Sequence, residues 1–127
     1  MNRRHAFDWV TVAAAIEVVT GLVLLIRPSL FGWLLFGAEL SGTGQALGRL
    51  TGLALLALAL ACWPRRGAES GPNPALRALL VFSLLTTVYL VYLGVGTGLV
   101  GPLLWPAAAL HTALTILLVH TWLNSPK

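Results

Sequence analysis

Four apolar stretches, each close to the length that crosses a lipid bilayer, occupy most of this 127-residue chain. They run from Phe7 to Ile26, Gly44 to Trp63, Pro74 to Gly94 and Pro102 to Leu123. At a rise of about 1.5 Å per residue, a helix of about 20 residues spans the roughly 30 Å hydrocarbon core. Lipid offers no hydrogen bonds to the backbone, so such segments must pair their own amides and carbonyls. The sequence therefore predicts an all-α, four-transmembrane-helix bundle.

Composition supports the membrane class. Hydrophobic residues make up 57% of the chain and charged residues 9%, whereas soluble domains carry about 25% charged residues. Little chain lies outside the four stretches, so we expect residues 1–127 to form a single membrane domain. The net charge of +4 gathers at the ends of the stretches rather than in a basic run, which indicates membrane orientation and not nucleic-acid binding.

The connection between the first two stretches is unusual. From Ser29 to Thr43 it reads SLFGWLLFGAELSGT, which is too apolar for a simple loop and too short for two further spanning helices. Its apolar and aromatic side chains suit the headgroup boundary, and Gly32 and Gly37 let the chain bend. We expect an interfacial or re-entrant segment, and the alternative is a first helix that continues past Pro28.

Basic residues give an orientation. Six of them fall on the side of the membrane that holds both termini, namely Arg3, Arg4, Arg65, Arg66, Arg77 and Lys127. Arg27 and Arg49 fall on the other side. The positive-inside rule then predicts that both termini are cytoplasmic.

The first apolar run follows two arginines, as in a secretory signal peptide. It is about 20 residues long, contains Glu17, and ends at Arg27 and Pro28 without a small-residue cleavage pattern. We predict that it is a retained helix.

Several polar residues fall inside the predicted spans. Glu17 and His111 are the eleventh and tenth residues of their stretches, so both lie near the midplane. Ionisable groups at that depth are costly and usually have partners. We predict a polar cluster, for a ligand or a proton, of Glu17, Arg49, Thr86, Thr87, Tyr89 and His111. Two alternatives remain: the cluster is a structural salt bridge, and Tyr89 is an interfacial anchor.

Small residues mark two helix faces. Ala13, Glu17 and Gly21 share one face of the first stretch, and Gly44, Gly48 and Gly52 form two overlapping GxxxG steps in the second. Such faces let helices approach closely in lipid. We expect the glycine face to be a helix contact, within the chain or with a partner in a homo-oligomer or larger membrane complex.

Motifs for most enzymes and metal sites are missing. The sequence contains no CxxC, HExxH, GxSxG or Walker A pattern, so we predict no metal site and no catalytic residue, and we disfavour an enzyme. No cofactor is predicted, because a haem held by two histidines needs both at one depth and the chain places only His111 near the midplane. The single cysteine, Cys62, fits a small apolar filler.

Three segments carry a resemblance: residues 17–28 (EVVTGLVLLIRP), 48–64 (GRLTGLALLALALACWP) and 101–111 (GPLLWPAAALH). They resemble small bacterial four-helix integral membrane proteins of unassigned function. The resemblance implies a bacterial inner-membrane location and no particular activity.

We expect the first of three functions that these features allow, and the other two are alternatives to it. The first is a non-enzymatic subunit or helper of a membrane complex or homo-oligomer. The second is a carrier or channel for protons or a small molecule, in which Glu17, Arg49 and His111 take part. The third is a binder of haem, quinone or pigment that uses His111 and Tyr89.

Overall fold

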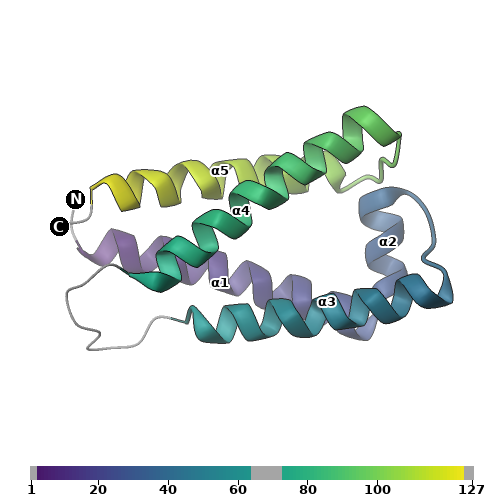
Figure 1. Ribbon diagram of the computed structural model, residues 1–127, viewed down its shortest axis with the longest axis horizontal. Coiled ribbons are helices and arrows are strands. Elements are labelled where there is room, and N and C mark those ends of the chain that lie inside the picture. The colour runs from purple at the N-terminus through teal and green to yellow at the C-terminus, as the bar shows by residue number, and fades with distance from the viewer. Residues whose placement is uncertain (1–2, 64–72, 125–127) are drawn as a thin grey trace.

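The computed structural model describes residues 3–63 and 73–124, with side chains from Trp9 onwards (Figure 1). Its elements are α1 (Arg3–Ile26), α2 (Pro28–Phe36), α3 (Gly42–Ala61), α4 (Pro74–Tyr92), the π-helical turn η1 (Leu93–Thr97) and α5 (Leu104–Leu123). Four segments are long and apolar enough to cross a membrane, namely Trp9–Ile26, Gly42–Ala61, Pro74–Thr97 and Leu104–Leu123. The predicted all-α architecture with four spans is confirmed.

Local sequence explains where the helices begin. Arg27 leaves the helical conformation (φ −135°, ψ 66°), and Pro28 then opens α2, so the first helix does not continue through the proline. Ser41 caps α3 by accepting a hydrogen bond from the Gly44 amide at 3.2 Å. Asn73 does the same for α4, where its side chain accepts from two amides of the first turn.

The end of the third span differs from the expectation. The sequence predicts an end at Gly94, but the helix continues through η1 to Thr97 and stops at Gly98 (φ 70°). The Thr97 hydroxyl donates to the Leu93 carbonyl at 2.8 Å. Glycine does not break the helix at position 94, because a spanning helix must keep its backbone bonds internal.

The four long helices lie along the bundle, and α2 lies across one of its ends (Figure 1). We call this the α2 end, and we call the opposite end, where α1 begins and α5 ends, the terminal end. The principal contacts join α1 to α3 and α4 to α5, and α1 also touches α5 and α4. The segment expected at the interface is thus a short separate helix.

Backbone hydrogen bonds hold α2 against the start of α5. The Gly101 amide donates to the Leu35 carbonyl at 2.9 Å, and the Leu103 amide donates to the Leu34 carbonyl at 2.8 Å. These bonds satisfy carbonyls in the last turn of α2, which have no partner inside their own helix. We call this pair of bonds the backbone clasp.

A hydrophobic core fills the terminal half of the bundle and draws on all four long helices. Its buried members are Val10, Ala13, Cys62, Leu76, Leu79, Leu114 and Leu118. Many other large apolar side chains are exposed along the helices. Such exposure suits a protein whose solvent is lipid, where outward apolar surface carries no penalty.

Burial of Cys62 in this core has a chemical consequence. Cys62 follows the last residue of the α3 span, and burial raises the pKa of its thiol. The thiolate is the reactive form, and a raised pKa leaves less of it at a given pH. We expect maleimide to label the folded protein at neutral pH slower by about tenfold or more than the denatured chain. The labelling rate should rise only at a pH above the ordinary thiol range, and equal rates for folded and denatured protein would contradict this burial.

Candidate functional site

Three polar side chains are buried in the middle of the bundle, on three different helices. Glu17 of α1 is 2% exposed, Ser83 of α4 is 1% exposed and His111 of α5 is 8% exposed. We call these three residues the polar layer. Full burial of such groups is rare in proteins unless they have partners.

The polar layer lies one helical turn from the apolar core, on the side of the α2 end. Along their helices, Glu17 follows Ala13 by four residues, Ser83 follows Leu79 by four, and His111 precedes Leu114 by three. Ala13, Leu79 and Leu114 pack together in the core. Residues three or four apart share a helix face, so the three polar residues occupy the next turn of the same three faces.

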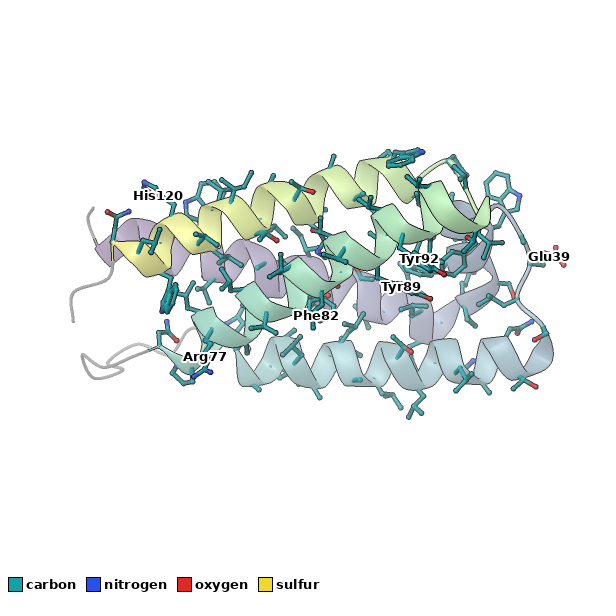
Figure 2. All side chains as sticks on the ribbon, turned by 45° about the horizontal axis from the view of Figure 1, so that its top comes forward. Glu39, Arg77, Phe82, Tyr89, Tyr92 and His120 are labelled. Carbon is teal, nitrogen blue, oxygen red and sulfur yellow. The ribbon has the colours of Figure 1, made fainter. Side chains whose placement is uncertain are left out.

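An aromatic contact connects two helices of this layer. The rings of Phe82 and His111 meet edge to face, with centroids 6.1 Å apart and an interplanar angle of 73°. Figure 2 shows Phe82 midway along α4. The imidazole is therefore held between α4 and α5 by packing.

Each residue of the polar layer has a buried atom without a hydrogen-bond partner in the described part of the chain. These atoms are Glu17 Oε1, Ser83 Oγ and His111 Nδ1. Leaving a buried polar group unsatisfied costs about 1–3 kcal/mol, so native structures do this rarely. A carboxyl, a hydroxyl and an imidazole can each accept a hydrogen bond and, when protonated, donate one. The layer can thus bind a proton or a small molecule with both donors and acceptors.

Two glycines fix the register between α1 and α3. A Cβ on Gly52 would lie 2.6 Å from the Gly21 carbonyl oxygen, and a Cβ on Gly21 would lie 2.9 Å from that of Gly52. Gly48 meets Pro28, whereas a Cβ on Gly44 would meet only side chains of its own neighbourhood. The structure therefore uses Gly48 and Gly52 for a contact within the chain, and it places Ala13 in the core.

The same register separates Arg49 from Glu17. The two helices are antiparallel (Figure 1), so Glu17 falls opposite Leu56 on α3. Arg49 lies seven residues, or about 10 Å, closer to the α2 end. Its side chain is exposed and forms no ion pair with any carboxylate of the described residues. The structure does not bring the predicted Glu17 and Arg49 pair together.

The remaining predicted residues lie at the edge of the layer or outside it. Thr86 and Thr87 are half-buried about one turn from Ser83, and the Thr87 hydroxyl donates to the Ser83 carbonyl at 2.9 Å. Tyr89 is 59% exposed and stacks on Tyr92 at the outside of α4 (Figure 2). Tyr89 therefore lies outside the polar layer, and its role as an interfacial anchor stays a prediction.

Ser83 was not among the predicted site residues. The available signal was its position on the face of α4 that also carries Leu76, Leu79 and Leu90. Among the described residues, no group of three or more His, Cys, Asp or Glu side chains is placed to hold a metal ion.

No protein-family model matches the chain, and no curated protein and no solved structure is significantly similar to it. The resemblance noted from the sequence is supported as far as the four apolar helices of a small membrane protein.

Proposed function

We propose that this multi-pass membrane protein carries protons, or a small polar solute, by way of the polar layer. One observation supports the proposal: three helices each place a buried, unsatisfied polar atom at the same level of the bundle. Polar groups at that depth commonly belong to ion or proton pathways. A purely structural polar cluster would be expected to satisfy its own members.

Each residue has a distinct part in this proposal. Glu17 takes up and releases the proton, His111 relays it through its imidazole, and the unpartnered Ser83 hydroxyl can accept a hydrogen bond from the carried species or donate one to it. Arg49 has no part in the transfer, because it lies about 10 Å from the level of Glu17 along the helix axis.

A flux assay tests the proposal. The protein is placed in liposomes that contain a pH-sensitive dye, and the decay of an imposed pH gradient is followed. We expect Glu17→Gln to slow the decay by about a hundredfold, since loss of a positioned acid or base commonly costs that much. Glutamine keeps the shape of the side chain and removes its exchangeable proton.

Glu39→Gln is the matched control. It removes the same chemical group from an exposed position in the α2–α3 connection (Figure 2), so the decay should match that of wild type. Equal decay for wild type and Glu17→Gln would refute proton transfer through this residue.

Association with a partner is the second candidate. Gly48 and Gly52 do not support association with a partner, because both contact α1 or Pro28 of the same chain. Arg49 favours it, because this exposed cation lies about 10 Å inside the α3 span without an acidic partner in the described part of the protein. Folded wild-type protein that leaves the pH gradient as stable as in protein-free liposomes would favour this candidate.

We further propose a bacterial inner membrane with the terminal end in the cytoplasm. The uneven distribution of basic residues supports this orientation. Arg77 lies at the terminal end of α4 (Figure 2) and Arg27 at the α2 end. Arg65, Arg66 and Lys127 also contribute to the predicted excess of basic residues at the terminal end, but they lie outside the described residues.

A further inference from the structure

An apolar groove runs along the junction of α1 and α2. Its volume is about 230 Å³, and its lining consists of Leu22, Val23, Ile26, Arg27 and Leu30. Four of these side chains are apolar, and Arg27 is the one charged group among them. The groove opens to the outside of the bundle, since Ile26 is 68% exposed.

The groove lies where the hydrocarbon core meets the lipid headgroups. The α1 span ends at Ile26, so Arg27 is the first residue beyond it. Trp33 on α2 is also exposed, as is usual for tryptophan at a membrane interface. The apolar part of the groove thus faces acyl chains, and its charged end faces the phosphate level.

Arg27 is free to bind an anion. Its side chain is exposed and has no hydrogen bond or ion pair with the described residues. A guanidinium binds phosphate oxygens in a bidentate fashion. No side chain caps the first turn of α2, which begins directly after Arg27, so the positive end of that helix adds to the same field.

We propose that this groove binds an anionic phospholipid of the surrounding bilayer. One acyl chain lies along the groove, and the phosphate lies on Arg27. The apolar lining gives no preference among lipids, because every lipid tail is as apolar as leucine. Selectivity comes from the headgroup, since a lipid with a net negative charge complements Arg27 better than a zwitterionic one.

Lipid retention provides the test. The wild-type protein is reconstituted in vesicles of equimolar phosphatidylglycerol and phosphatidylcholine, extracted in mild detergent, and weighed with its bound lipids by native mass spectrometry. We expect phosphatidylglycerol to be retained over phosphatidylcholine by about fivefold, the effect of one arginine beside an anionic lipid. Arg27→Gln should bring the two lipids to parity, and Arg27→Lys should keep part of the preference.

Two further variants separate charge from shape. Val23→Phe fills the groove without changing charge and should lower the retention of both lipids. Arg77→Gln removes an exposed arginine from the other end of the bundle and should leave the preference unchanged. The proposal is wrong if wild type shows no preference, or if Arg27→Gln or Val23→Phe behaves like wild type. Flux through Glu17 is a separate property, so its presence or absence does not affect this test.

Discussion

A single methyl group added at Gly52 is expected to lower the free energy of unfolding by about 1–3 kcal/mol, the usual cost of overpacking a well-packed interior. The Cβ of Gly52→Ala would lie 2.6 Å from the Gly21 carbonyl oxygen and 2.9 Å from the Leu25 amide nitrogen. Both obstacles are backbone atoms, so no side chain can rotate to make room. The α1 and α3 helices must move apart, and the register that places Glu17 is lost with them.

The matched control is Gly42→Ala. A Cβ at Gly42, the first residue of α3, meets nothing within 4 Å, and alanine is favoured over glycine in a helix by up to about 1 kcal/mol. The same substitution on one helix is therefore expected to stabilise at position 42 and destabilise at position 52. Unfolding in mixed micelles with a rising fraction of dodecyl sulfate, followed by circular dichroism, measures both. Equal stabilisation at both positions would mean that α3 does not pack on α1 through Gly52.

Glu17→Leu is expected to abolish the flux and at the same time to raise the free energy of unfolding by about 1–3 kcal/mol. Glu17 Oε1 is buried without a hydrogen-bond partner among the described residues. Leucine has a similar size and no polar atom to satisfy, so it removes that penalty. A substitution that lowers activity but raises stability is typical of a functional residue whose burial is itself destabilising.

Measuring both the flux and the free energy of unfolding distinguishes a functional role of Glu17 from a purely structural one. If Glu17 had a purely structural role, its substitution would lower the free energy of unfolding of the protein, because the hydrogen-bond partners of its carboxyl would be left unsatisfied. Glu39→Leu serves as the control, since this acid is exposed and should change neither the flux nor the unfolding midpoint. A less stable Glu17→Leu with wild-type flux would overturn the role of Glu17 in the polar layer.

The spans were predictable because lipid imposes strict rules on a backbone. A segment that crosses the hydrocarbon must be long, apolar and internally hydrogen-bonded, and the sequence carries each of these signs. The predicted end of the third span is wrong by three residues. The glycine-rich run from Gly94 predicts a helix end there, yet η1 continues the helix to Thr97.

The candidate site was predictable in depth but not in register. The residue count from each helix end predicts that Glu17 and His111 lie near the midplane, and the structure buries both side chains in the middle of the bundle. The predicted depth of Arg49 lets its long side chain reach toward Glu17. In the structure, the contact between Gly21 and Gly52 sets the helix register so that Arg49 lies about 10 Å from the level of Glu17 along the α3 axis. The offset between two helices depends on packing at a few small residues, which one sequence does not specify.

The other differences between the predicted and the observed site concern which side chains of α4 face the interior of the bundle. Tyr89 lies six residues, or about 9 Å, beyond Ser83 along α4, on an exposed face of that helix where it stacks on Tyr92. Ser83 lies on the buried face of the same helix. The hydroxyl by itself is a weak signal, because serine in a helix can bond its own backbone, and only its position on the face of Leu76 and Leu79 distinguishes it.

The backbone clasp imposes an order on biogenesis. The carbonyls of Leu34 and Leu35 receive their partners from Leu103 and Gly101, which leave the ribosome more than sixty residues later. Until then the last turn of α2 must bond to water or to lipid headgroups at the membrane surface. We therefore expect α2 to reach its final position only after residues 101–103 have been synthesised, whereas α1 and α3 can pair earlier.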